Sequence, residues 1–142
     1  MKQEGYAAGK IVSVNIGALK GQKKHSVGRC MLNVDVGVEG DAHAGSDIRQ
    51  VSLLAEESID RMRALGSEAG YGDFAENFTT QGIVLHTLAI GNRLLAGRSV
   101  LLEITQIGKV CHDRCAIFHA VGDCIMPREG IFARVLAGGE VR

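Results

Sequence analysis

Three of the four cysteines in the sequence lie between residues 103 and 131, in one segment that also holds two histidines. These residues are Cys111, His112, Cys115, His119 and Cys124. Cysteine is usually either buried in a core or used in chemistry, and clustering with histidine and charge favours chemistry. This segment is therefore where we first expect a functional site.

Cys111 is the candidate reactive cysteine of this segment. Its neighbours Lys109, His112 and Arg114 supply positive potential, which favours the thiolate over the thiol. A thiolate at this position can accept sulfur as a persulfide, attack an electrophile or bind a soft metal. A buried structural thiol is the alternative, and the charged neighbours disfavour it.

The same cysteines allow a zinc site formed by Cys111, Cys115 and Cys124. Their spacing is C-x3-C followed by a third cysteine after eight residues, and no second closely spaced pair occurs. Structural zinc sites usually combine two such pairs. The order of the residues also differs from the C-x-x-C-H pattern of a c-type haem site. Zinc stays open as an alternative.

A second polar cluster, Asp41, His43 and Arg49, lies beside Gly40 and Gly45. Polar residues bracketed by glycines are typical of a loop that a ligand approaches closely. Arg49 can bind an anionic oxygen through two parallel hydrogen bonds. The alternative is an exposed polar turn.

The elements that position these residues are expected to be short strands joined by tight turns. A strand over residues 99–106, with Val100, Leu102 and Ile104 on one face, leads into the cysteine segment. Nineteen glycines spread along the chain suit the turns of a barrel or sandwich. Further strands are predicted over residues 10–16, 26–38, 48–55, 76–80 and 131–136, and a hairpin or one-turn helix followed by a strand over residues 83–96.

One amphipathic helix is predicted over residues 56–65. Ile59, Met62 and Leu65 recur at helical spacing, acidic residues occupy the first turn, and Gly66 can end the helix. A second short helix is predicted over residues 116–121. Cys30, at the start of the strand over residues 26–38, is expected to be a small core residue. The predicted fold class is mainly β, with one or two short helices.

Composition limits the class of protein. The 142 residues suit a single domain, and 46% apolar with 23% charged residues is ordinary for a globular chain. Sixteen basic residues balance sixteen acidic ones, and aromatic residues make up only 4%, so nucleic-acid binding is not expected. No signal peptide or membrane-spanning run occurs, so we expect no membrane association and a cytoplasmic protein. Thiols there stay reduced, which favours free cysteines or a metal site over disulfides.

An ordered series of motifs over about residues 9–141 resembles the MOSC domain, the C-terminal domain of molybdenum cofactor sulfurases. The motifs are GDAHAG, RQVSLLAEESID, AENFTTQGI, IGNRLLAG with SVLLEITQIGKVC, and REGIFARVLAGGEV. The chain is most similar to the short, stand-alone bacterial members. The resemblance implies one domain over residues 1–142, a mainly β, barrel-like fold, and a role in molybdenum cofactor chemistry. Members also occur in molybdenum-dependent reductases of amidoxime-type compounds.

The family's characteristic cysteine follows a strand ending in Thr-Gln and a short loop, and it is thought to carry sulfur or to bind molybdenum. Counted from Thr105 and Gln106, Cys111 has this position. Val110 replaces the proline that usually precedes the cysteine. The sequence holds neither the N-terminal β-domain of the reductases nor the pyridoxal-phosphate domain of the fused sulfurases. We therefore expect a separate sulfur donor, such as a cysteine desulfurase.

The leading hypothesis is a protein that binds the molybdenum cofactor (molybdopterin) and handles sulfur, with Cys111 carrying sulfur or binding molybdenum. The expected cofactor-binding residues are Asp41, His43, Arg49, Asn77, Lys109 and Arg114, and the expected partners are molybdenum cofactor biosynthesis proteins or a cysteine desulfurase. One alternative is a non-catalytic zinc-binding or partner-docking module that uses Cys111, Cys115 and Cys124. Another is a small molybdenum-dependent reductase component.

Overall fold

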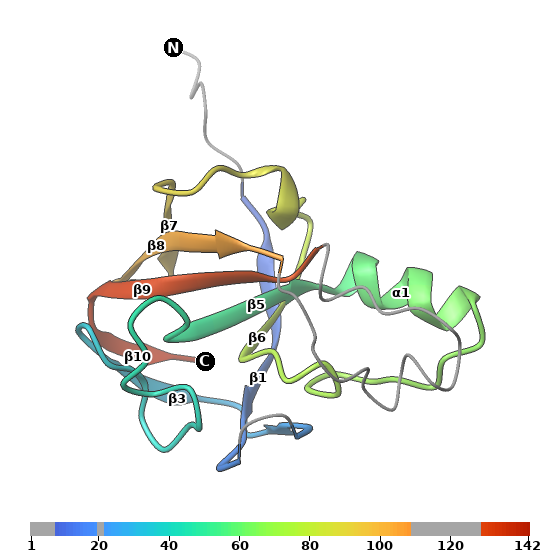
Figure 1. The fold of residues 1–142 in the computed structure, drawn as a ribbon, viewed down its shortest axis with the longest axis horizontal. Coiled ribbons are helices and arrows are strands. Elements are labelled where there is room, and N and C mark those ends of the chain that lie inside the picture. Colours follow the sequence, from blue (N-terminus) through green and yellow to red (C-terminus); the bar gives the residue numbers. More distant parts are fainter. Residues whose placement is uncertain (1–7, 20–21, 109–128) are drawn as a thin grey trace.

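The computed structural model describes residues 8–19, 22–108 and 129–142 (Figure 1). The elements are β1 (Lys10–Ile16), β2 (His25–Ser26), β3 (Cys30–Asn33), β4 (Gly37–Val38), β5 (Val51–Ala55), α1 (Glu56–Ala64), β6 (Phe78–Gln81), the short 3₁₀ helix η1 (Leu85–Thr87), β7 (Arg93–Ala96), β8 (Val100–Ile107), β9 (Ile131–Ala137) and β10 (Gly139–Val141). The predicted mainly β class is confirmed. The helix predicted over residues 116–121 lies outside the described residues.

The strands form two sheets. One has seven strands in the order β2-β1-β6-β5-β9-β8-β7, and the other has three in the order β10-β3-β4. Figure 1 shows β1 running across the direction of β5, β8 and β9, so the large sheet is strongly coiled. In the described part of the chain no strand pairing joins β7 back to β2 or β1, so the closed barrel is not confirmed.

The large sheet is buried on both faces at its centre. Alternate residues of β9 lie on opposite faces of the sheet, because successive side chains of a strand point in opposite directions. Ile131 and Ala133 enter the main core, which also holds residues of the small sheet, whereas Phe132 packs in a second core with Leu54 of β5 and Ile59 of α1. The face of the large sheet that carries Ile131 and Ala133 is the main-core face, and the face that carries Phe132 is the Phe132 face.

Helix α1 begins and ends close to the predicted positions. Acidic residues occupy its first turn and basic residues its last, which complements the helix dipole. Ile59 and Met62 are buried as predicted, but Leu65 is 59% exposed. The helix ends at Ala64, so Leu65 no longer follows the buried face, and Gly66 has the positive φ that ends many helices.

Several strand boundaries differ from the prediction. The strand predicted over residues 26–38 is instead β2 followed by the hairpin of β3 and β4, in which Leu32 pairs with Val38. The chain reverses at Asp35, which has a φ of 55°. The alternation of apolar residues continues through this reversal, so the pattern predicted one continuous strand and not a turn. β5 and β6 begin three and two residues later than predicted, at Val51 and Phe78.

Cys30 is the first residue of β3 and is buried in the main core, as predicted.

No helix within the described residues has the length and apolarity that crossing a bilayer requires.

At one edge of the large sheet, the start of β9 lies between β5 and the end of β8. Ile131, which opens β9, pairs with Leu53 in the middle of β5 and with Ile107 at the end of β8. The Gly108 amide donates to the Gly130 carbonyl at 2.6 Å. The segment that carries three cysteines therefore leaves and rejoins the described fold at this edge.

Candidate functional site

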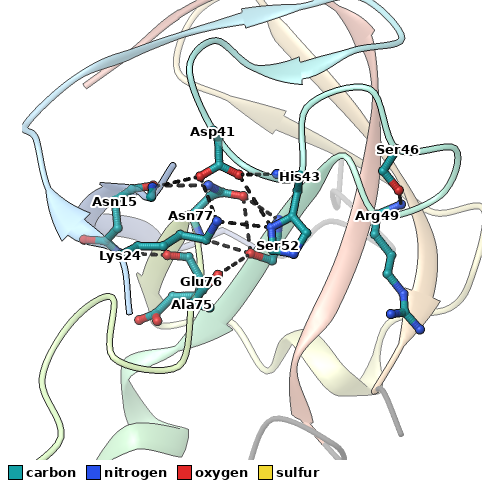
Figure 2. A network of polar contacts seen from close by, with 11 residues as sticks. Asn15, Lys24, Asp41, His43, Ser46, Arg49, Ser52, Ala75, Glu76 and Asn77 are labelled. Carbon is teal, nitrogen blue, oxygen red and sulfur yellow. Dashed lines mark hydrogen bonds and ion pairs between the residues drawn. The ribbon is translucent and has the colours of Figure 1, made fainter. Parts of the chain in front are cut away.

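A carboxylate with no solvent exposure lies at the centre of a polar network (Figure 2). Asp41, in the turn after β4, accepts hydrogen bonds from the Lys24 ammonium at 2.7 Å, the Gly17 amide at 3.0 Å and the His43 amide at 3.1 Å. Burial alone would raise the pKa of Asp41, but the hydrogen bonds from the Lys24 ammonium and from the Gly17 and His43 amides outweigh it and hold that pKa well below its usual range. Asp41 is therefore a fixed negative charge.

The network sets the tautomer of His43. Its Nδ1 lies 3.1 Å from the Lys24 ammonium and 3.5 Å from an Asp41 oxygen. The short contact decides the assignment, because an ammonium has hydrogens to donate and no lone pair to accept with. Nδ1 is the acceptor, so the ring proton is on Nε2. His43 therefore has an Nε2–H donor available for a ligand.

Arg49 lies on the Phe132 face with His43. Its guanidinium carbon is 5.4 Å from the centre of the Phe132 ring, and the His43 ring meets the same ring edge-on with centroids 6.5 Å apart. The Arg49 Nε donates to Gln106 at 2.9 Å, and Gln106 donates to the Gly108 carbonyl at 2.8 Å. Its two terminal nitrogens have no hydrogen-bond partner among the described residues. Figure 2 shows this side chain pointing away from the Asp41 network.

Asn77 is buried directly before β6 and joins three strands. Its Oδ1 accepts from the Ser52 amide of β5 at 3.0 Å, and its Nδ2 donates to the Asn15 carbonyl of β1 at 3.1 Å. Asn15 in turn donates to the Glu76 carbonyl and to Thr79. The position of Asn77 therefore fixes β6 between β1 and β5.

Glu76 is a buried carboxyl that the sequence analysis did not select. Its Oε2 accepts from Thr79 at 2.7 Å and from the Gly72 amide at 3.1 Å, whereas its Oε1 has no partner among the described residues. Burial raises the pKa of Glu76, and the hydrogen bonds from Thr79 and Gly72 offset this only in part. Lys24 was also missed, because a lysine-rich glycine turn is usually solvated. Polar residues within predicted strands, such as Asn15, were the only feature of the sequence that could have indicated this buried polar cluster.

The structure brings three of the predicted site residues together and places a fourth nearby. Asp41 contacts His43, and His43 and Arg49 flank Phe132; Asn77 belongs to the neighbouring cluster of β1, β5 and β6. The predicted site residues Lys109, Cys111, Arg114, Cys115 and Cys124 lie outside the described residues. Within residues 8–19, 22–108 and 129–142, no three side chains of His, Cys, Asp or Glu form a group that could hold a metal ion.

A model of the MOSC domain matches residues 40–142. The chain belongs to the MOSC domain family. This family is associated with functions related to the molybdenum cofactor. The match includes Asp41, His43, Arg49 and Asn77, but Lys24 and its part of the network precede it. Comparison with the curated proteins finds no match.

Solved structures share the fold of this MOSC protein. YuaD from Bacillus subtilis has 16% identity and a TM-score of 0.76, with 94% of this chain and 90% of that chain covered. YiiM from Geobacillus stearothermophilus has 20% identity and a TM-score of 0.69, covering 95% of this chain and 71% of that one. YiiM from Escherichia coli has 21% identity and a TM-score of 0.65, covering 94% and 65%. These similarities support the fold beyond the matched residues, including β1 to β3.

Proposed function

We propose that this MOSC protein is a cytoplasmic carrier that binds the molybdenum cofactor and holds sulfur on Cys111. The observation that carries the proposal is the Arg49 guanidinium. It is held by Gln106 and Phe132 beside the end of β8, with two nitrogens that no described residue occupies. A planar guanidinium with its own position fixed is the group best suited to bind a phosphate through two hydrogen bonds.

The described residues fit an anionic pterin ligand. Arg49 would hold its phosphate, and the Nε2–H of His43 would donate to a second polar group on the same face of the sheet. Asp41 and Lys24 keep His43 in the donating tautomer. Asn77 acts through the strands that it fixes, since its side chain is used in contacts with β1 and β5. When bound, the cofactor supplies the molybdenum centre for sulfur or oxygen chemistry.

The position of Cys111 in the chain limits its distance from this group. It is the third residue after Gly108, and consecutive Cα atoms are about 3.8 Å apart, so its Cα lies within about 11 Å of that of Gly108. Gln106 links Gly108 to Arg49 through hydrogen bonds. We assign Lys109 and Arg114 to the same anionic ligand or to the Cys111 thiolate.

Sulfur loading conserves atoms and charge. The Cys111 thiolate attacks the outer sulfur of a persulfide on the donor, here a cysteine desulfurase. The donor S–S bond breaks, an S–S bond forms on Cys111, and the donor leaves as a thiolate. For release, the Cys115 thiol attacks the inner sulfur of the Cys111 persulfide. Hydrosulfide leaves, and Cys111 and Cys115 remain joined by a disulfide.

Cofactor content of the full chain, purified from a molybdenum-replete host, tests the proposal. We expect molybdenum and pterin in the wild type. Arg49→Gln should lower the retained pterin about tenfold, because a hydrogen bond to a charged group is lost. Arg98→Gln is the matched control, since Arg98 is an exposed arginine that does not contact the site. Equal retention by both variants would contradict the assignment of Arg49.

Persulfide loading, followed by mass spectrometry after incubation with a cysteine desulfurase and cysteine, tests the sulfur role. Cys111→Ser should abolish loading and leave the fold intact, Cys115→Ser should change only the lifetime of the persulfide, and Cys124→Ser should have the smallest effect. Stoichiometric zinc that all three variants lose together with stability would instead indicate the zinc-binding module. Retained cofactor without sulfur loading, but with reduction of an amidoxime in the presence of an electron donor, would indicate the reductase component.

A further inference from the structure

Three side chains from two elements contact the Glu129 carboxylate, close to the start of β9. The Ser58 hydroxyl donates to its Oε1 at 2.6 Å, the Arg61 guanidinium forms an ion pair with the same oxygen, and the His86 Nδ1 lies 3.7 Å from it. Ser58 and Arg61 are three residues apart in α1 and share one face of this helix, and His86 belongs to η1. The Glu129 side chain is only 13% exposed. α1 and η1 therefore fix the chain directly before Gly130 and β9.

Gly130 joins this contact to the end of β8. Its carbonyl accepts a hydrogen bond from the Gly108 amide at 2.6 Å. Gly108 directly follows β8 and has a φ of 72°, in the left-handed region that favours glycine. The described chain stops at Gly108 and resumes at Glu129, so the hydrogen bond joins the two points at which the cysteine segment meets the rest of the fold.

Gly108 is also linked to Arg49. Its carbonyl accepts from the Gln106 Nε2 at 2.8 Å, and the Gln106 Oε1 accepts from the Arg49 Nε at 2.9 Å. A continuous series of bonded and hydrogen-bonded residues therefore consists of Glu129, Gly130, Gly108, Gln106 and Arg49. Within the described part of the chain, no hydrogen bond or ion pair joins Glu129 to Arg49 directly.

The series determines how firmly the Arg49 guanidinium is held. An arginine that is ordered before its ligand arrives binds more tightly than a free one, because less rotamer freedom is lost on binding. The Gln106 amide can order Arg49 only if the amide itself is held, and the Gly108 carbonyl holds it. The position of Gly108 depends in turn on Gly130 and therefore on the contacts of Glu129.

We infer that Glu129 is a positioning residue for Arg49, which acts through Gly130, Gly108 and Gln106. The segment with Cys111 also begins after Gly108, so the same anchor serves the guanidinium and the start of that segment. The inference rests on the proposed function only for the ligand that Arg49 binds. It gives a use to the contacts of Ser58, Arg61 and His86, none of which touches Arg49 through a hydrogen bond or ion pair among the described residues.

Nuclear magnetic resonance of the full chain labelled with ¹⁵N tests the inference, because amide exchange reports on local opening. Glu129→Gln removes the charge that pairs with Arg61, so exchange of the Gly108 amide should rise about tenfold. The Arg49 Nε–H signal should move towards that of the exposed Arg98. Exchange of the Ile104 amide, which donates to the Asn92 carbonyl, should keep its wild-type rate.

Retained pterin, measured after purification from a molybdenum-replete host, should fall about threefold to tenfold in Glu129→Gln. Ser58→Ala, which removes one contact of Glu129 and keeps its charge, should shift the same signals in the same direction by less. Glu140→Gln is the matched control, since Glu140 also forms ion pairs with arginines but lies in β10. All of these measurements should remain at their wild-type values in this control.

Unchanged Gly108 exchange and an unchanged Arg49 signal in Glu129→Gln would overturn the inference. An equal rise in exchange at Ile104 would also overturn it, because Glu129 would then act only on the global stability of the fold. If both signals respond and the wild type retains no pterin, the positioning role of Glu129 is supported and the proposed function is contradicted.

Discussion

At the scale of single residues, two adjacent lysines form ion pairs of very different character. Lys24 and Asp41 are 2.7 Å apart with side chains 1% and 0% exposed, whereas Lys23 and Asp73 are 3.9 Å apart and the Lys23 side chain is 62% exposed. A buried pair stabilises a fold little compared with apolar residues, but it is costly to break. The buried pair is therefore best explained by what it orients, which is His43.

Asp41→Asn should lower the free energy of unfolding by about 3–5 kcal/mol, because the Lys24 ammonium stays buried without its counter-charge. Asp73→Asn, the same change in the exposed pair, should cost about 0–1 kcal/mol. Urea denaturation of both variants at pH 7 measures the difference. Similar losses would show that the Lys24 ammonium reaches solvent in the variant.

Glu76→Gln should become more stabilising as the pH rises. Burial raises the pKa of Glu76, so the folded protein holds this proton more tightly than the unfolded chain, in which a glutamate titrates near about 4.3. Stability is therefore lost as the pH rises from about 4.3 through the higher folded pKa. Urea midpoints of wild type and variant should differ least at about pH 4 and most at about pH 8. A difference that does not change with pH would contradict the raised pKa.

At the scale of elements, the loop between α1 and β6 holds the buried lysine in place. The Lys24 amide donates to the Gly72 carbonyl at 2.8 Å, and the Gly72 amide donates to Glu76. Gly72 has a φ of +84°, and a Cβ on it would lie 2.3 Å from the Lys24 carbonyl oxygen. Only glycine permits this approach, so one residue of the loop determines where the Lys24 backbone lies.

Gly72→Ala should destabilise the fold by more than about 2 kcal/mol, because it adds a left-handed alanine and a clash with backbone. Gly70→Ala, in the same loop, should have little effect, since nothing lies within 4 Å of its added Cβ. Thermal unfolding of the two variants measures this contrast, and persulfide loading of Gly72→Ala shows whether the damage reaches the proposed site. Equal melting temperatures would mean that the loop shifts without cost.

At the scale of the whole molecule, one coiled sheet separates two environments. The Phe132 face carries Arg49 and His43 beside the edge where β5, β8 and β9 meet, and the main-core face packs against the small sheet. Figure 1 shows α1 at one end of the sheet and the small sheet of β3 and β10 at the other. The small sheet contributes Cys30 and Leu32 to the main core, so both sheets are expected to unfold together.

Cys30 should report this global unfolding. Burial, followed by the charges of Asp41 and Glu140, raises the pKa of Cys30 to about 12, so the folded protein holds almost no thiolate there at pH 8. Its alkylation by iodoacetamide should therefore rise with urea in parallel with the unfolding measured by circular dichroism, and it should be the last of the four cysteines to react. Labelling of Cys30 before Cys111 in the absence of urea would contradict both the burial of Cys30 and the assignment of Cys111 as the reactive thiol.

The sequence by itself determined the features that depend on local pattern. The run KIVSVNI predicted β1 with its observed bounds, alternation predicted the buried face of β8, and helical spacing predicted most of α1. The ordered motifs indicated the MOSC family, and the Thr105-Gln106 pair within them lies close to the end of β8 at Ile107. These predictions were possible because the periodicity of a strand or a helix depends only on residues that are close in the sequence.

Only the tertiary structure decided which polar residues work together. Lys24 reaches Asp41 across 17 residues, Arg49 reaches Gln106 across 57, and Asn77 reaches the Asn15 carbonyl across 62. Contacts of this separation depend on how strands are ordered in the sheet, which local periodicity does not encode. Lys24 shows the same limit: lysines of a glycine-rich turn are usually solvated, but burial against Gly72 and the Asp41 carboxylate makes this one the counter-charge at the centre of the network.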